Sequence, residues 1–183
     1  TKAAVAGGYA QILDMPNNTP PTISKKELDK KIRLARGRIW CDIGFNFGGV
    51  PQSVSEFASI YNKVFGLKVY MNQTTGTLLV EDKSQREIVF KNWKSAVPIM
   101  VHAEGKALEE AIRLAKKYKK RLHVCHIVAS QLPIIEKAKK QKIKITCEVC
   151  PHHLFLTKSD EKKLGPLAVM KPPLISKKEV KGL

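Results

Sequence analysis

The sequence predicts an α/β protein and, within that class, an incomplete (β/α)8 barrel of the TIM type. Apolar runs of strand length alternate with helix-like runs along the chain, which is typical of parallel sheets joined by helices. Three successive strand-like runs also carry a residue that can hold a metal ion, namely Lys68, His102 and His126. In such barrels the chemistry gathers at the C-terminal ends of successive strands. Because a complete barrel needs about 250 residues and this chain has 183, we expect part of a barrel.

The expected elements follow one another in a regular order. We expect strands at residues 10–15, 39–45, 65–71, 97–101, 121–126 and 143–149. Helices are expected at residues 24–36, 54–64, 84–93, 105–118 and 130–140, and Ser24 stands where a helix N-cap is favoured. Strands with intervening helices pair in parallel through right-handed crossovers. No linker or repeat interrupts residues 1–183, which predicts one partial barrel domain.

The charge of the chain is strongly positive, with 33 basic and 16 acidic residues and a formal net charge of +17. A nucleic-acid partner is one reading of such a charge. The lysines, however, alternate with apolar residues at helical spacing and have no stacking aromatic residues between them. This pattern favours a solvated outer surface of helices, without a nucleic-acid partner. A small anionic substrate would be attracted in either case.

The cysteines indicate a reducing environment. Cys41, Cys125, Cys147 and Cys150 lie at or near the ends of apolar runs, rather than in the spaced loops of a disulfide framework. No run of about 18 apolar residues suggests a membrane span. We therefore expect a soluble, cytoplasmic protein without a membrane partner.

Lys68, His102 and His126 can each be explained without a metal. Lys68 lies inside an apolar strand, where an ammonium group must find a partner, lose its proton or be chemically altered. A salt-bridged lysine near the strand end is the simpler explanation. A single strand-end histidine is more often a hydrogen-bonded core residue than a ligand. Two of them on adjacent strands favour a metal, because their ring nitrogens can point at one ion.

Three motifs carry a family resemblance. They are Met-Pro-Asn-Asn-Thr-Pro-Pro at residues 15–21, Gly-Leu-Lys-Val-Tyr at 66–70 and Cys-Glu-Val-Cys-Pro-His-His-Leu-Phe-Leu at 147–156. With the two strand-end histidines, they resemble the dihydroorotases, metal-dependent hydrolases of the cyclic amidase branch of the amidohydrolase superfamily. The resemblance extends over nearly the whole chain.

The resemblance implies a site for two zinc ions. In this family a lysine at the end of the fourth strand is carboxylated and bridges the two metals, and Lys68 matches it. His102 and His126 match the ligands of the more exposed metal. A carbamate between two cations would also remove the problem of a buried positive charge.

Substrate contacts are implied as well. Asn17 matches a residue that binds the substrate carboxylate. Thr74 and Thr75 match a mobile loop after the fourth strand that touches bound substrate, although the same residues fit an ordinary polar turn before Gly76.

The resemblance leaves open the roles of Cys125, Glu148 and His153, as further metal ligands or as residues behind the site. In some dihydroorotases the first two reach an additional zinc ion. We favour a small buried Cys125 that faces away from the site and a Glu148 that orients a histidine. Of His152 and His153, one is expected to face the substrate and the other to pack.

Two parts of the family pattern are absent from the chain. It has no His-x-His-x-Arg motif, which in the family supplies ligands of the other metal and a substrate arginine. The eighth-strand aspartate that serves as general base is also absent, so no catalytic residue of that kind can be assigned. The resemblance implies strands two to seven of a longer enzyme, inactive without the remainder.

The implied reaction is the reversible, zinc-dependent cyclisation of N-carbamoyl-L-aspartate to L-dihydroorotate in pyrimidine biosynthesis. One alternative is another cyclic amidase, such as an allantoinase or dihydropyrimidinase. The other is a non-catalytic, dihydroorotase-like scaffold that supports aspartate transcarbamoylase. The expected partner is a second copy of the chain, in a homodimer, or aspartate transcarbamoylase.

Overall fold

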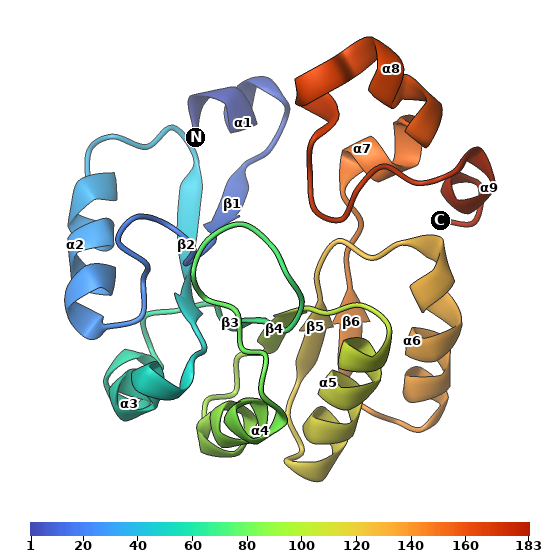
Figure 1. Ribbon diagram of the computed structural model, residues 1–183. Helices are drawn as coiled ribbons and strands as arrows, with labels where there is room; N and C mark the ends of the chain where they lie inside the picture. The colour runs from blue at the N-terminus through green and yellow to red at the C-terminus, as the bar shows by residue number, and fades with distance from the viewer. The chain divides into compact units, whose positions relative to one another are not determined.

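The computed structural model describes residues 1–183 as two compact units, Thr1–Met100 and Val101–Leu183. The strands follow chain order, β1 to β6, and the pairs β1·β2, β2·β3 and β5·β6 are parallel. Strands alternate with helices (Figure 1). The α/β class is therefore confirmed, while a single domain stays a prediction.

The first unit contains the elements up to the beginning of β4. They are α1 (Lys2–Ala6), β1 (Gln11–Asp14), α2 (Lys25–Ala35), β2 (Asp42–Gly48), the 3-10 helix η1 (Pro51–Glu56), α3 (Phe57–Ile60), β3 (Gly66–Tyr70), α4 (Lys83–Asn92) and β4 (Ile99–His102), whose last two residues belong to the second unit. Ser24 caps α2 as expected, because its side chain accepts a hydrogen bond from the backbone N–H of Glu27.

An aromatic cluster forms the core of the first unit. The ring of Phe57 packs edge-on against Phe47, with centroids 6.4 Å apart, and against Trp93 at 5.1 Å. All three side chains are buried. Phe57 lies in α3, Phe47 lies in β2 and Trp93 directly follows α4. The cluster therefore packs these two helices against the sheet.

Two predicted elements differ clearly from the structure. The strand expected at residues 39–45 begins at Asp42 and continues to Gly48, because Ile39 and Trp40 are exposed whereas the residues from Gly44 onward are buried. The helix expected at residues 54–64 is a 3-10 turn followed by the single turn of α3. Pro51 starts that turn, where its fixed φ is compatible with the helix and its missing N–H is not needed.

The second unit contains the remaining elements. They are α5 (Lys106–Lys117), β5 (Leu122–Val124), η2 (Ala129–Gln131), α6 (Leu132–Lys140), β6 (Ile145–Cys147), α7 (Pro151–Phe155), η3 (Lys158–Asp160), α8 (Glu161–Leu164), η4 (Gly165–Ala168) and α9 (Lys177–Val180). The segments from α7 onward, orange to red in Figure 1, were not predicted as helices. They are too short to show helical periodicity.

Helix α5 illustrates how the lysines are arranged. Leu108, Ala111 and Leu114 are fully buried at spacings of three residues, which places one apolar stripe against the unit. Lys116 and Lys117 in the last turn are exposed. The basic residues of this helix thus lie on its solvent side. None of the helices in the structure combines the length and apolar character needed to cross a membrane.

Candidate metal and substrate site

Lys68 occupies the middle of β3, a strand buried along its whole length. Its side chain is 2% exposed, and its Nζ lies 5.1 Å from the centre of the Tyr70 ring. Lys68 forms no ion pair, so the salt-bridged lysine considered from the sequence is not what the structure contains. An aromatic face compensates only part of the cost of burying an ammonium group. Lys68 therefore has the environment of a functional or modified lysine.

Asn46 is a buried polar residue on the neighbouring strand. It was not among the site residues predicted from the sequence. In the register of β2 and β3, Asn46 pairs with Gly66, and Gly48 pairs with Lys68. Alternate residues of a strand point to the same face, so the side chains of Asn46 and Lys68 share one face of the sheet. The Asn46 side chain is fully buried and its Oδ1 has no hydrogen-bond partner. Asn46 is a polar residue within the apolar run of β2, and this pattern could have identified it from the sequence as a candidate site residue.

His102 and His126 meet in the second unit. His102 ends β4, and His126 follows β5 by two residues. Nδ1 of His102 lies 3.0 Å from Nε2 of His126, and the ring centroids are 4.6 Å apart. The two chain segments are held together by a hydrogen bond from the Cys125 N–H to the Val101 carbonyl. The expected pairing of these two histidines on neighbouring strands is thus present.

The geometry of this pair suits a metal ion. At 3.0 Å, one nitrogen donates a proton and the other accepts it. Zinc–nitrogen bonds of about 2.0–2.1 Å place tetrahedral ligands roughly 3.3 Å apart. A cation can therefore replace the shared proton after a shift of a few tenths of an ångström. His126 also has a φ of +39°, a strained conformation that is typical of functional sites.

The surroundings of the pair are partly acidic. His102 is 1% exposed, and its Nε2 lies 3.7 Å from a carboxylate oxygen of Glu104. A carboxylate at this place favours positive charge at the histidines, whether a proton or a metal provides it. Lys68 belongs to the first unit, and its joining with this pair stays a prediction.

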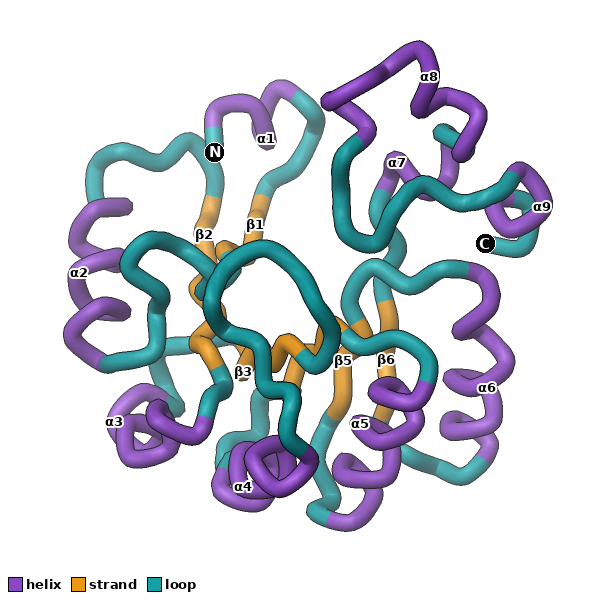
Figure 2. Tube along the Cα trace, viewed as in Figure 1, coloured by secondary structure: helices purple, strands orange, loops and turns teal.

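The predicted substrate residues lie together in the first unit. Asn17 is half-buried just after β1. Gly76 has a φ of +93°, and a Cβ built on it would lie 3.4 Å from the Asn17 Cβ. The long loop between β3 and α4, teal in Figure 2, therefore passes beside Asn17. It carries Thr74, which is half-buried, and Thr75, which is exposed. A role of Thr74 and Thr75 in substrate binding stays a prediction.

A second group of potential ligands contains Cys125 and Glu148. Together with His123, they offer donor atoms within 4.8 Å of one another. Glu148 lies 3.4 Å from His123, whose other ring nitrogen hydrogen-bonds to Thr146 at 2.8 Å. Glu148 thus lies beside a histidine, as expected, but that histidine was not singled out from the sequence. Cys125 is buried as expected, yet it takes part in this group.

His153 lies on α7 and is fully buried. Its Nε2 hydrogen-bonds to the carbonyl oxygen of Pro173 at 3.1 Å. The neighbouring His152 is half-buried. His153 is thus the packed histidine of the two, while a substrate-facing role for His152 stays a prediction.

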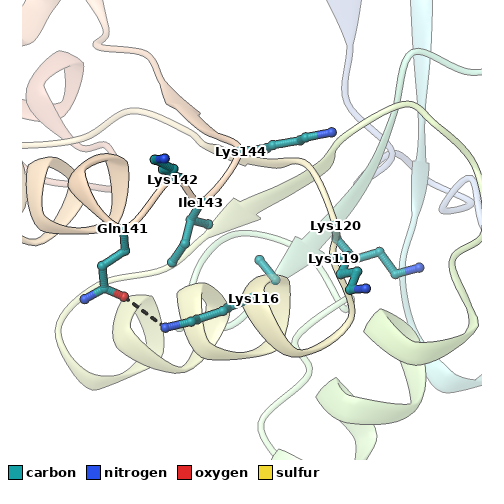
Figure 3. Close-up of a pocket in the computed structure, with 8 residues that line it drawn as sticks. Lys116, Lys119, Lys120, Gln141, Lys142, Ile143 and Lys144 are labelled. Carbon is teal, nitrogen blue, oxygen red and sulfur yellow. Dashed lines mark hydrogen bonds between the residues drawn. The ribbon is translucent and has the colours of Figure 1, made fainter.

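A basic pocket of about 280 Å³ lies elsewhere in the second unit (Figure 3). Its five lysines are Lys116, Lys119, Lys120, Lys142 and Lys144. Lys116 donates a hydrogen bond to the side-chain oxygen of Gln141. The segments that line it precede β5 and β6, whereas His102 and His126 lie at the C-terminal ends of their strands. Chemistry in this fold gathers at the C-terminal ends, so the pocket is separate from the candidate metal site.

Comparison with known proteins gives homologues over nearly the whole chain, although no family model matches it. The multifunctional protein CAD of Squalus acanthias is 33% identical over 180 residues, which cover 98% of this chain and 8% of that protein. A dihydroorotase of Methanosphaera stadtmanae is 34% identical over 202 residues, covering 95% of this chain and 47% of the enzyme. The chain thus spans about half the length of this dihydroorotase and far less of CAD.

Two solved structures resemble the fold. An L-hydantoinase (dihydropyrimidinase) from Arthrobacter aurescens has a TM-score of 0.92 at 22% identity, over 99% of this chain and 48% of that one. The inactive dihydroorotase-like domain of a CAD-like multifunctional protein from Chaetomium thermophilum has a TM-score of 0.82 at 22% identity, over 100% of this chain and 52% of that one. The predicted incomplete barrel is thereby confirmed.

Proposed function

Because this chain belongs to the cyclic amidohydrolases that include the dihydroorotases, we propose that it is part of a zinc-dependent dihydroorotase. The reaction is the reversible cyclisation of N-carbamoyl-L-aspartate to L-dihydroorotate in pyrimidine biosynthesis. The observation that carries the proposal is the 3.0 Å contact between His102 Nδ1 and His126 Nε2. Two imidazoles at successive strand ends, with nitrogen atoms 3.0 Å apart, can serve as two ligands of one metal ion.

Lys68, His102 and His126 are the proposed metal ligands, with Lys68 carboxylated. Burial of Lys68 without a carboxylate partner supports this modification, because a carbamate held by cations replaces an unpaired buried ammonium group. When bound, zinc supplies Lewis-acid polarisation of the ring amide carbonyl and lowers the pKa of water. The orphaned Oδ1 of Asn46, on the same face as Lys68, is a candidate acceptor for the N–H of the carbamate.

Asn17 and the loop after β3 are the proposed substrate contacts. The side-chain amide of Asn17 would donate a hydrogen bond to the substrate carboxylate, and the hydroxyl groups of Thr74 and Thr75 would orient the ring. The close approach of Gly76 to Asn17 supports a shared role. A loop at this place can also exclude water from the reacting amide. The net charge of +17 favours the approach of an anionic substrate.

The remaining machinery is proposed to lie in the rest of a longer protein. Two parts of the family site have no counterpart among these 183 residues. They are the general-base aspartate and the ligands that bind only the second zinc ion. We propose that the chain covers strands two to seven of one barrel domain and has little activity alone. A cytoplasmic location and association as a homodimer or with aspartate transcarbamoylase belong to the same proposal. A relative named as a multifunctional protein supports such an association.

Two other functions remain candidates, each favoured by one likeness. The L-hydantoinase fold match favours a different cyclic amide, such as that of an allantoinase or dihydropyrimidinase substrate. The match to an inactive dihydroorotase-like domain favours a scaffold. A scaffold has no need for a buried lysine and a facing histidine pair, which is why we rank it lower.

The test is substrate turnover by the full-length protein. Ring opening of dihydroorotate, hydantoin, dihydrouracil and allantoin should be measured side by side, with zinc and bicarbonate present. We expect dihydroorotate to be the preferred substrate by kcat/KM. Preference for another ring would replace dihydroorotase by the corresponding amidase. No turnover of any ring, in a folded protein that binds zinc, would favour the scaffold.

A further inference from the structure

Three metal-binding side chains gather at the first turn of α7. Cys150, His152 and His153 offer one thiol and two imidazoles, and their donor atoms lie within 4.8 Å of one another. All come from four consecutive residues of the second unit. The group shares no residue with the pair His102 and His126.

His153 has one ring nitrogen without a partner. Its Nε2 lies 3.1 Å from the Pro173 carbonyl oxygen, which can only accept, so Nε2 carries the proton. In the neutral ring, Nδ1 is then left with a lone pair. The side chain is 0% exposed and Nδ1 has no hydrogen-bond partner. A buried acceptor without a donor is unfavourable, and a bound cation would satisfy it.

The hydrogen bond to Pro173 is also a familiar support for a metal ligand. Metal-bound histidines usually donate their other ring N–H to a carbonyl or carboxylate, which fixes the ring and its tautomer. His153 has this arrangement already. This hydrogen bond leaves Nδ1 as the ring nitrogen that can coordinate a metal ion.

His152 and Cys150 complete the donor set. The half-buried imidazole of His152 is a nitrogen ligand of the kind that zinc and similar cations accept. Its ring centroid lies 4.4 Å from that of His153. Cys150 is a half-buried cysteine outside any disulfide, at the N-cap position of α7. A thiolate is a ligand for zinc and other soft or borderline cations.

The spacing of the donors requires only local adjustment. With zinc–sulfur bonds of about 2.3 Å and zinc–nitrogen bonds of about 2.0–2.1 Å, tetrahedral donors lie roughly 3.3–3.7 Å apart. The present separations of at most 4.8 Å would therefore close by about 1 Å. Side-chain rotation within one helical turn can supply this movement.

We propose that Cys150, His152 and His153 form a zinc site distinct from the strand-end histidines. Three protein ligands leave a fourth position for water or for another ligand. The site binds a borderline divalent cation through one sulfur and two nitrogens. It can be tested apart from dihydroorotase activity, because the proposed function gives none of its three ligands a role in that reaction.

The test is a titration of the zinc-free full chain with Co²⁺. Cobalt bound to a thiolate gives a charge-transfer absorption that cobalt bound to nitrogen and oxygen alone does not. We expect this absorption in the unaltered chain and its loss in Cys150→Ser. The matched control is Cys147→Ser, a half-buried cysteine three residues earlier, which should keep it. His152→Gln should weaken cobalt binding by about tenfold or more.

Cys125→Ser separates this site from the group of His123, Cys125 and Glu148. Absorption lost in Cys125→Ser but unchanged in Cys150→Ser would overturn the proposal, as would absence of the band from the unaltered chain. If Cys150→Ser does not fold, the half-buried His152 supplies the decisive variant, and unweakened binding by His152→Gln would overturn the proposal. An inactive full-length enzyme with an intact cobalt–thiolate band would count against the proposed function alone.

Discussion

The two histidine pairs of the second unit look alike in ring packing and differ in chemistry. The rings of His102 and His126 are 4.6 Å apart at 65°, and those of His152 and His153 are 4.4 Å apart at 60°. In the first pair, two nitrogens face each other at 3.0 Å. In the second, one nitrogen of His153 hydrogen-bonds to Pro173 instead. Ring contact alone therefore does not show which nitrogen of each ring is available to a metal ion, whereas the hydrogen bonds of the rings do.

The two pairs also differ in what assembles them. His102 and His126 are 24 residues apart and meet because β4 and the segment after β5 lie side by side. His152 and His153 are consecutive and need only one turn of helix. The first pair thus depends on the pairing of strands, whereas the second depends on local sequence and on the carbonyl group of Pro173.

The largest expected effect separates the pairs by activity. In the full-length protein, His126→Ala should lower kcat/KM by about 10³-fold or more, because a proposed ligand of the catalytic metal is lost. His152→Ala should change it by less than about tenfold. Steady-state kinetics with dihydroorotate measure both values. Equal losses of kcat/KM in His126→Ala and His152→Ala would remove the functional distinction between the pairs. A loss in His123→Ala as large as that in His126→Ala would favour a catalytic metal at Cys125 and Glu148.

The next effect concerns the partner proposed for the first pair. Lys68→Ala should lower kcat/KM by about 10²- to 10³-fold and reduce the zinc content, because the proposed bridging carbamate is lost. A small carboxylate such as acetate should restore part of the activity. The unaltered protein should show the mass of one added carbon dioxide when prepared with bicarbonate. Normal zinc content in Lys68→Ala would exclude Lys68 as a ligand.

A smaller effect is expected in the stability of the second pair. His153→Ala should lower the free energy of unfolding by about 2–3 kcal/mol, since it removes a fully buried ring and its hydrogen bond to Pro173. His152→Ala, at a half-buried position, should cost less than about 1 kcal/mol. Urea unfolding of the metal-free chains gives both values. Equal free energies of unfolding for the two variants would contradict the larger contribution expected from the buried His153.

The smallest effect is a pH dependence that comes from His152 in the second pair. Burial lowers the pKa of His152 in the folded chain below its usual 6.5, so the unfolded chain binds a proton first as the pH falls. The stability that comes from neutral His152 is therefore complete above about pH 6.5 and declines below it. His152→Gln should flatten the stability profile between about pH 7 and 5 in metal-free protein. An unchanged profile would mean that His152 does not titrate differently on folding.

Asp29 supplies a control for that measurement in the first unit. Hydrogen bonds from Lys25 and Lys63 lower its pKa to about 2. Its contribution is present above the unfolded pKa of about 3.9 and is lost as the pH falls towards about 2. Asp29→Asn should thus leave the profile above pH 5 unchanged in shape.

The order and type of the main elements were determined by the sequence itself. Helix α5 was expected at residues 105–118 and lies at Lys106–Lys117, because its buried residues recur every three or four positions. The strands of the barrel were recognised by short apolar runs, and the family motifs placed Lys68, His102 and His126 on them. These signals are local, since periodicity records which side of an element faces the core.

Only the tertiary structure decided which side chains meet. The contact of His102 with His126, and that of His123 with Glu148, depend on strand register and on side-chain rotamers across more than 20 residues. Asn46 Oδ1 lacks a hydrogen-bond partner, and this depends on which residue of β3 pairs with Asn46. The free lone pair of His153 depends on a carbonyl 20 residues away. Hydrophobic periodicity carries no information about such pairings, because it records burial and not the direction of a donor atom.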